Sequence, residues 1–278
     1  MAAQAGAGVK AIAFLLSALI GTAHADELTI PSLDGRLQLR AWWFPVQTNE
    51  PRPAIVGLHG CGGALDAKGR LRQRWHHDAR SFEQKRMHLL VVDSFSARGV
   101  KSVCEQRVAE RAVSVRVRRG DVFAALQWLA RQPGVDATRI ALVGRSNGGS
   151  TVLSALDRSD PDLSAQAVQP RAAVAFYPGC RAFAAQHGYA LAAPLLLMIG
   201  ELDDWTPARS CVELHEKLQR GFDLVVYPGS YHGFDGLGEI RERQNLPTRS
   251  GKATVGANRE AARDAQRRMF EFLSARLQ

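Results

Sequence analysis

The stretch Arg139-Ile-Ala-Leu-Val-Gly-Arg-Ser-Asn-Gly-Gly149 sets the expectations for the whole chain. Its apolar run ends in Gly144-Arg145-Ser146-Asn147-Gly148, and small and apolar residues follow up to Leu156, which predicts a strand, a sharp turn and a helix. Glycines two positions before and after a serine have the spacing of a nucleophile elbow, where only small neighbours avoid collision. Ser146 is therefore the first candidate nucleophile, although the bare motif also occurs in ordinary glycine turns.

The first residues differ from the rest of the 278-residue chain, whose composition indicates one globular domain. Lys10 precedes the apolar segment Ala11 to Ile20, and Thr22-Ala23-His24-Ala25 offers a small-residue cleavage pattern. We therefore expect a signal peptide over residues 1–25 and a domain over residues 26–278, periplasmic or secreted and without a membrane span. The alternatives, a short membrane anchor or a buried helix, fit less well because the apolar segment is short for a bilayer.

The chain is basic, with a formal net charge of +9 that the loss of Lys10 lowers by one. This positive charge favours binding partners with acidic surfaces, or anionic ligands. Arginines concentrate in residues 107–119, but no aromatic residues interleave with them and no nucleic-acid motif accompanies them. We expect a solvated basic face there and no nucleic-acid partner.

Strand-like and helix-like segments alternate along the mature chain. A hairpin is expected around Asp34-Gly35, and residues 233–258 read as a long loop. Further strands are expected at 54–58, 88–92, 140–143, 172–177, 194–199 and 224–227, and helices at 70–85, before 131, after 146, at 207–219 and at about 258–277. The segment 113–118 alternates like a strand, but we assign it to the start of a crossover helix. The alternation predicts an α/β fold with a mostly parallel sheet of about eight strands and helices on both faces.

A serine hydroxyl attacks well when a histidine takes its proton and a carboxylate orients that histidine. Loops at the carboxyl ends of parallel strands converge on one crevice, so the partners should follow later strands. Two such loops carry Asp203 with Asp204 and, further on, His232. The order Ser, Asp, His is that of α/β-hydrolases. Either aspartate alternatively serves only to start the helix that Thr206 caps and Pro207 opens.

Acyl transfer places negative charge on an oxygen, which preorganised N–H groups must face. Asn147 follows the candidate nucleophile and supplies one backbone N–H. The glycine-rich segment His59-Gly-Cys-Gly-Gly63 is similar to an H-G-G-G oxyanion loop, and we assign the second donor to Cys61, with Gly60 or Gly62 as alternatives. An ordinary glycine turn is the competing interpretation.

Five motifs, spread in order over nearly all of the mature chain, carry a resemblance to a known family. They are His59-Gly-Cys-Gly-Gly63, Val92-Asp-Ser-Phe95, Gly144-Arg-Ser-Asn-Gly-Gly149, Gly200-Glu-Leu-Asp203 with Pro207, and Tyr231-His-Gly-Phe234. As a set they resemble the dienelactone hydrolase family of α/β-hydrolases. The resemblance implies a triad of Ser146, Asp203 and His232, with Asp203 preferred to Asp204.

Two departures from the family pattern bear on the substrate. The type enzymes have a cysteine at the elbow, where this chain has Ser146, which favours a general serine esterase. They also hold a substrate carboxylate with arginines; Arg98 matches one of these, but Asp235 follows Phe234 here. We therefore expect a serine hydrolase that cleaves small soluble esters or lactones through an acyl-enzyme, without metal or cofactor. The alternatives are dienelactone hydrolase or peptidase activity on the same triad, and a non-catalytic binding protein for an anionic ligand.

The loops at the predicted crevice suggest further details. The segment from Cys180 to Ala193 is too short for a large lid, and Tyr177, Trp205 and Phe234 are expected to line the substrate pocket, unless they only pack within their loops. None of the four cysteines is in a C-x-x-C pair, which argues against zinc, and an oxidising compartment would pair them. In the fold that the resemblance implies, Cys61 and Cys104 follow neighbouring strands, as do Cys180 and Cys211, so we predict these two disulfides. The sequence leaves the oligomeric state open.

Overall fold

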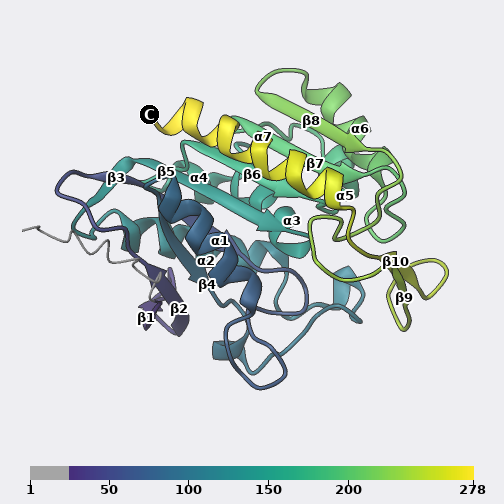
Figure 1. Cartoon of the computed structure of the whole chain (residues 1–278), viewed down its shortest axis with the longest axis horizontal. Coiled ribbons are helices and arrows are strands. Elements are labelled where there is room, and N and C mark those ends of the chain that lie inside the picture. The colour runs from purple at the N-terminus through teal and green to yellow at the C-terminus, as the bar shows by residue number, and fades with distance from the viewer. Residues whose placement is uncertain (1–24) are drawn as a thin grey trace, which may run out of the picture.

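The computed structural model describes residues 25–278 (Figure 1), and the predicted signal peptide lies, apart from Ala25, outside the described residues. The strands are β1 (Asp26–Pro31), β2 (Gln38–Phe44), β3 (Arg52–Leu58), β4 (His88–Val92), β5 (Val135–Arg145), β6 (Ala172–Phe176), β7 (Leu195–Gly200), β8 (Phe222–Tyr227), β9 (Arg241–Arg243) and β10 (Ala253–Val255). The helices are α1 (Gln73–Gln84), α2 (Val115–Leu129), α3 (Asn147–Ala155), α4 (Pro161–Ser164), α5 (Arg181–Ala185), α6 (Ala208–Leu218) and α7 (Arg259–Leu277), with short 3-10 turns at Ser96–Arg98 and Val108–Glu110. No helix of this described part is long and apolar enough to cross a membrane.

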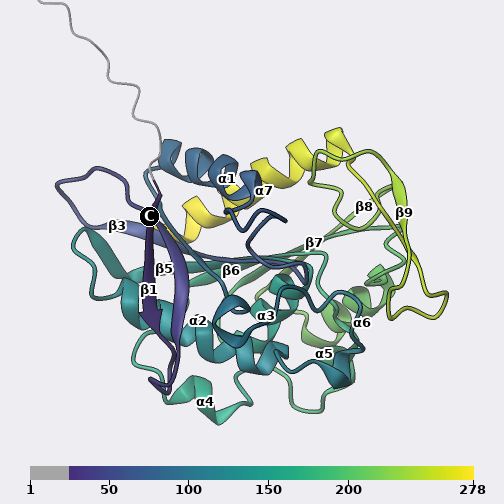
Figure 2. The ribbon, with the colours of Figure 1, turned by 90° about the horizontal axis from the view of Figure 1, so that it is seen from below.

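Within the described residues, eight strands form one sheet in the order β1-β2-β4-β3-β5-β6-β7-β8. The hairpin β1–β2 is antiparallel, β2 pairs antiparallel with β4, and all other neighbours are parallel. The helices α1 and α7 cover one face of the sheet, and α2, α3, α5 and α6 cover the other (Figure 2). Every residue of β4, β6 and β7 is buried, because strands covered on both faces bury both of their rows of side chains. The predicted α/β-hydrolase architecture is confirmed.

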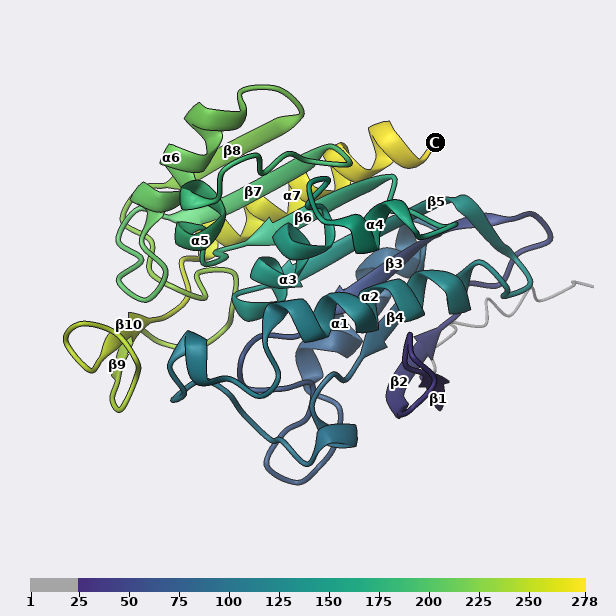
Figure 3. The same cartoon turned by 180° about the vertical axis from the view of Figure 1, so that it is seen from behind.

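Two local predictions have different outcomes. The ambiguous segment 113–118 joins α2, which begins at Val115 after its N-cap Ser114, whose hydroxyl accepts the N–H of Val117 at 3.3 Å. The predicted long loop 233–258, in contrast, contains the hairpin β9–β10, which lies beyond the carboxyl ends of the central strands (Figures 1 and 3). A bridge between His232 and Val255 ties this hairpin to the histidine loop.

The basic stretch 107–119 is not uniformly a solvated face, and the prediction is wrong for two of its arginines. Arg118 and Arg119 are 0% and 4% exposed. Arg119 pairs with Asp160 and Asp162, while Arg118 reaches backbone and amide oxygens inside the protein. Burial of these two cations follows from the helical phase of α2, which turns them toward the sheet and toward α4.

Both predicted disulfides are confirmed. Cys61 is bonded to Cys104, and Cys180 is bonded to Cys211. The first joins the loop after β3 to the loop after β4, and the second joins the segment after β6 to α6. Between β6 and β7 the described chain has only the five-residue α5, in agreement with the expected absence of a large lid.

Candidate active site

Ser146 occupies a strained turn between β5 and α3. Its φ and ψ are 54° and −118°, a conformation that few non-glycine residues adopt. A Cβ on Gly144 would be 2.3 Å from the carbonyl oxygen of Gly148, and one on Gly148 would be 2.1 Å from that of Leu58. Both flanking glycines are therefore required by close backbone contacts. The N–H of Ser146 donates to the carbonyl of Phe176 at 2.9 Å, which fixes the turn against β6.

His232 lies between Ser146 and Asp203. Its Nε2 is 2.9 Å from Oγ of Ser146, and its Nδ1 is 2.8 Å from Oδ2 of Asp203. Because an ionised carboxylate only accepts hydrogen bonds, Nδ1 carries the proton and Nε2 is free to accept the serine hydroxyl. The histidine and aspartate side chains are 6% and 0% exposed, so little water competes for these two hydrogen bonds.

The two neighbouring aspartates have different environments. Asp203 accepts hydrogen bonds from the N–H groups of Trp205 and Thr206 at 3.0 and 2.8 Å, and from the Thr206 hydroxyl at 3.0 Å. Asp204 is exposed and instead accepts the N–H of Thr254 in β10 at 2.8 Å. Asp203 thus faces His232, and Asp204 fastens the β9–β10 hairpin.

The loop after β3 lies directly against the elbow. A Cβ on Gly60 would be 3.6 Å from the Cβ of Ser146. The backbone N–H of Cys61 has no acceptor among residues 25–278, while the Cys61 carbonyl accepts from Val103 at 2.9 Å. Asn147 is the first residue of α3, where N–H groups lack partners within the helix. Both predicted donor segments therefore adjoin the serine.

A buried arginine connects these two segments. Arg118 donates to the side-chain oxygen of Asn147 at 2.5 Å and to the carbonyl of His59 at 2.8 Å. Burial lowers the pKa of Arg118 to about 10, and the attraction of more distant carboxylates partly offsets this effect. Because this pKa is still far above 7, Arg118 remains a cation at neutral pH. Sequence reasoning missed this residue. The helical spacing could have revealed it. Arg118 lies four residues before Val122 and seven before Ala125, and both of these are buried, so the three share one face of the helix.

His59 is structural in this arrangement. Its Nδ1 donates to the carbonyl of Gly60 at 2.8 Å, and its Nε2 accepts the N–H of Ser94 at 3.2 Å. Burial, with the nearby Arg118 cation, lowers the pKa of His59 well below its usual value. The neutral imidazole therefore ties the loop after β3 to the loop after β4.

Two predicted pocket aromatics flank His232. The Tyr177 ring meets it edge-on with centroids 4.7 Å apart, and the Trp205 ring is tilted against it at 4.8 Å. The guanidinium of Arg243, from β9, lies 5.1 Å from the Trp205 ring and reaches Sγ of Cys104 at 4.0 Å. Trp205 is partly exposed, whereas Tyr177 is 6% exposed, so Trp205 has the more accessible surface beside His232.

A charged cluster lies behind the elbow. Asp235 accepts the Tyr177 hydroxyl at 2.7 Å and Nε of Arg145 at 2.8 Å, and it also pairs with Arg74. Asp78 pairs with the same two arginines at 2.8 and 3.1 Å. Burial alone would raise the pKa of Asp235, but the two arginines hold it well below its usual range. The cluster packs against Tyr177, whose ring contacts His232.

Two predicted substrate residues are engaged elsewhere. Both terminal nitrogens of Arg98 bind the carboxylate of Asp121, at 2.9 and 2.8 Å, and one also donates to the Ser94 carbonyl at 2.7 Å. Phe234 is 0% exposed and packs between Tyr177 and Tyr227, with ring centroids 5.7 and 4.9 Å away. Phe234 therefore shapes the core beneath the histidine loop without an open surface for a substrate.

The chain resembles known proteins in sequence and in fold. A model of the dienelactone hydrolase family matches residues 92–277, whereas a comparison with curated protein sequences gives no match. A putative dienelactone hydrolase from Klebsiella pneumoniae is 20% identical, with 90% of this chain and 98% of that chain covered and a TM-score of 0.67. Esterase 2 of Thermogutta terrifontis is 18% identical, with 92% and 96% covered and a TM-score of 0.65. The dienelactone hydrolase-like promiscuous phosphotriesterase P91 from metagenomic libraries is 19% identical, with 91% and 99% covered and a TM-score of 0.65.

The structural likenesses establish the fold, and the family model establishes the relationship, because it covers more than half of the sequence. The elbow, the serine–histidine contact and the adjoining loop after β3 lie where that fold collects its reactive groups. The chain therefore belongs to the dienelactone hydrolase family of α/β-hydrolases and is a hydrolase that acts on ester bonds.

Proposed function

We propose that the mature protein is a serine esterase that cleaves small soluble carboxylic esters or lactones through an acyl-enzyme formed on Ser146. The observation that carries this proposal is the chain of hydrogen bonds from Ser146 Oγ to His232 Nε2, at 2.9 Å, and from His232 Nδ1 to Asp203 Oδ2, at 2.8 Å. A serine nucleophile needs the first contact with its general base, and that base needs the second contact with the acid that orients it.

In the acylation step, Oγ of Ser146 attacks the ester carbonyl carbon as His232 Nε2 takes the hydroxyl proton. The carbonyl electron pair moves onto oxygen, and the N–H groups of Cys61 and Asn147 donate to that oxyanion. Asp203 stabilises the imidazolium that forms. When the tetrahedral intermediate collapses, the carbon–oxygen bond to the alcohol breaks, and the leaving alkoxide takes the proton from Nε2. Preorganised donors of this kind supply several kcal/mol of transition-state stabilisation.

Deacylation repeats the same proton transfers with water. His232 Nε2 accepts a proton from the attacking water, whose oxygen bonds to the acyl carbon. Collapse of the second intermediate returns the proton to Oγ of Ser146 and releases the carboxylic acid. One histidine therefore serves both steps, provided that Asp203 keeps the proton on Nδ1.

The surroundings of the serine favour a small and soluble substrate. The short α5 leaves the connection between β6 and β7 without a lid, and Trp205 offers an apolar wall beside His232. Thermogutta terrifontis esterase 2, which shares this fold, has a structure with butyrate bound. We infer that the acyl group of the substrate is short. Arg98 is saturated by Asp121, so the substrate need not carry the carboxylate of a dienelactone.

Export is part of the proposal. The leader-like sequence at residues 1–25 and the two disulfides are together suited to an oxidising compartment outside the cytoplasm. We expect the mature protein, isolated from the exported fraction of cells, to begin at Asp26. Mass spectrometry of its N-terminal peptide identifies that first residue. An intact Met1 in the mature fraction would contradict it.

The experiment for the activity is a rate comparison on p-nitrophenyl acetate, butyrate and octanoate, with small lactones and an amide analogue as further arms. We expect hydrolysis of the short esters to exceed that of octanoate and of the amide. Hydrolysis of the amide but of none of the esters or lactones would assign the same residues to a peptidase.

A further inference from the structure

A cavity lies on the face of the sheet opposite α3. It has a volume of about 670 Å³, within the range of small-molecule sites. Its walls come from α1 and α7, which lie together on that face (Figure 2), and from the segment that follows Phe234. Ser146, Asp203 and His232 are not among the described residues that line it, although Arg145 and Asp235 of the charged cluster behind the elbow are.

The cavity carries an excess of positive charge. Two of its arginines, Arg74 and Arg145, are neutralised by Asp78 and Asp235. Three more line it, and none of them has a carboxylate within ion-pair distance among residues 25–278: Arg80 from α1, and Arg259 and Arg263 from α7. Residues four apart on a helix lie on one face, so the last two point into the same space. Arginine is the side chain best suited to carboxylate and phosphate oxygens.

Part of the wall of this cavity is apolar, beside the paired charges of Arg74, Arg145, Asp78 and Asp235. Phe82, Phe176 and Met269 line it and are 2%, 2% and 4% exposed. Leu237 also lines it and is 100% exposed, which leaves a large hydrocarbon side chain at the mouth without packing partners. Arginines and buried aromatics on one cavity wall suit a ligand that has a charged end and a hydrocarbon end.

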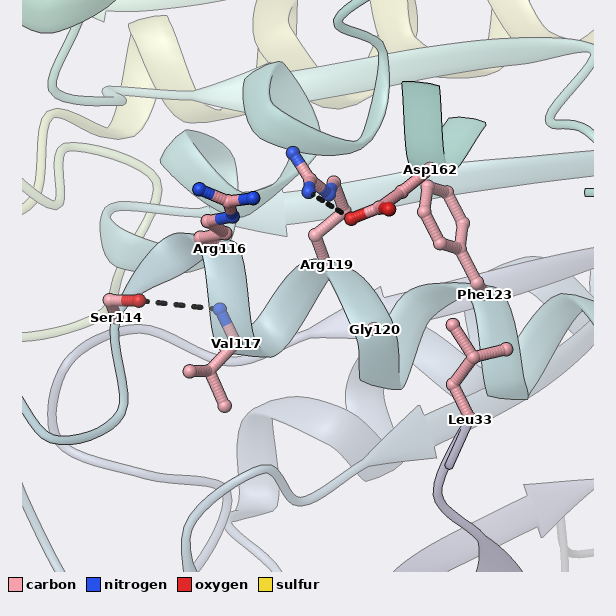
Figure 4. Close-up of a pocket in the computed structure, with 8 residues that line it drawn as sticks. All are labelled: Leu33, Ser114, Arg116, Val117, Arg119, Gly120, Phe123 and Asp162. Carbon is pink, nitrogen blue, oxygen red and sulfur yellow. Dashed lines mark hydrogen bonds and ion pairs between the residues drawn. The ribbon is translucent and has the colours of Figure 1, made fainter. Parts of the chain in front are cut away.

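Another pocket among the described residues is smaller and has fewer arginines without an ion pair (Figure 4). It runs along the outside of α2, has a volume of about 240 Å³ and is lined by Leu33, Phe123 and Arg119 among others. There the carboxylates of Asp160 and Asp162 already occupy the guanidinium of Arg119. Within residues 25–278, Arg116 is the one other arginine that lines this pocket, against three without an ion pair in the larger cavity. The cavity between α1 and α7 is therefore the stronger candidate for an anion.

We propose that the cavity between α1 and α7 binds a single-chain amphiphilic anion, with its carboxylate or phosphate head on Arg259, Arg263 and Arg80 and its chain against Phe82, Phe176 and Met269. This inference does not depend on the esterase activity. A fatty acid and an alkyl phosphate share the required chemistry, and the choice of head group is part of the test.

The test is calorimetric titration of the purified protein with octanoate, octyl phosphate, octanol and inorganic phosphate. Octanol has the tail without the charge, and inorganic phosphate has the charge without the tail. The variant R259Q/R263Q removes two arginines of the site. Its control, R267Q/R268Q, removes the same charge from the same helix, from side chains that pair with Asp264 outside the cavity. A third variant, A262F, fills the cavity and keeps every arginine.

We expect octanoate, octyl phosphate or both to bind at least about tenfold more tightly than octanol and inorganic phosphate. R259Q/R263Q should weaken that binding by about tenfold or more, as expected for the loss of charge-assisted hydrogen bonds, and A262F should abolish it. Equal weakening by R259Q/R263Q and R267Q/R268Q, or undiminished binding to A262F, would overturn the site. Equally tight binding of octanol or of inorganic phosphate would overturn the ligand class.

Discussion

The side chain of Arg118 donates to the side-chain oxygen of Asn147 at 2.5 Å. Its other terminal nitrogen holds the carbonyl of His59 at 2.8 Å. One buried guanidinium thus joins the first residue of α3 to the loop that carries Cys61. Since both segments supply a proposed oxyanion donor, the planar geometry of Arg118 sets their separation.

The first prediction concerns this arginine. In R118K the charge remains, but a lysine cannot reach both oxygens with a rigid fork. We expect kcat on p-nitrophenyl acetate to fall by about tenfold or more with little change in KM, because the donors act in the transition state. The neighbouring change R119K, at a buried residue that pairs with Asp160 and Asp162 and contacts neither donor segment, should leave kcat within about twofold. Equal kcat values in the two variants would refute a positioning role for Arg118.

The second prediction separates the two aspartates. D203N should lower kcat by about a thousandfold or more, because an amide no longer secures the histidine tautomer. D204N should stay within a few-fold of the wild type, since Asp204 binds only the exposed hairpin at Thr254. Steady-state kinetics of the two purified variants measure this difference. A larger loss in D204N would exchange their roles.

The third prediction uses pH. The pKa of Asp235 lies well below its ordinary value of 3.8 because of Arg74 and Arg145, so its ionised form stabilises the fold above that value. D235N should cost about 3 kcal/mol of unfolding free energy at neutral pH, since Arg74 and Arg145 must then share the single carboxylate of Asp78. As pH falls below about 4, the wild type loses this contribution progressively and its advantage over D235N narrows.

Urea unfolding at a series of pH values checks this prediction. The matched change is D223N, at an exposed carboxylate that is 3.5 Å from its arginine, and it should have little effect at any pH. A wild-type advantage over D235N that grows toward low pH would have the wrong sign.

The fourth prediction compares the disulfides. Removing either pair, as C61S/C104S or C180S/C211S, should cost about 3 to 4 kcal/mol of stability, given the 43- and 31-residue separations. Only the first bond anchors the loop that contacts Ser146, so C61S/C104S should also lower kcat at a temperature where both variants remain folded. Thermal unfolding and ester hydrolysis on the same samples measure both effects. A lower kcat in C180S/C211S than in C61S/C104S would contradict the proposed place of the oxyanion loop.

Much of this architecture was predictable because its signals are local. The glycines around Ser146 are required because a Cβ at either position would lie 2.1 or 2.3 Å from a backbone oxygen, and the apolar strands follow from burial on both faces. Asp203 and His232 follow the parallel strands β7 and β8, so the sheet itself places them at one edge. The cysteine pairs were predictable only through the fold that the family resemblance implies.

The less predictable features depend on long-range contacts. Arg74 and Asp235 are 161 residues apart in sequence yet form an ion pair, and no local pattern relates them. Arg118 stands in a segment that alternates like a strand, which hid the helical phase that buries it. Arg98 matched a family position, but only the fold reveals that Asp121 takes both of its terminal nitrogens.

The central claim is that Ser146 is the nucleophile, and the site at which a fluorophosphonate attaches tests it most directly. Tryptic peptide mapping of the labelled wild-type protein should find one adduct, on Ser146. S146A should take up no label, and labelling of H232Q should be slower by about a thousandfold or more, because the serine hydroxyl then lacks its base. A folded, ester-hydrolysing wild-type protein that takes up no label, or an adduct on another residue that persists in S146A, would contradict the proposed mechanism.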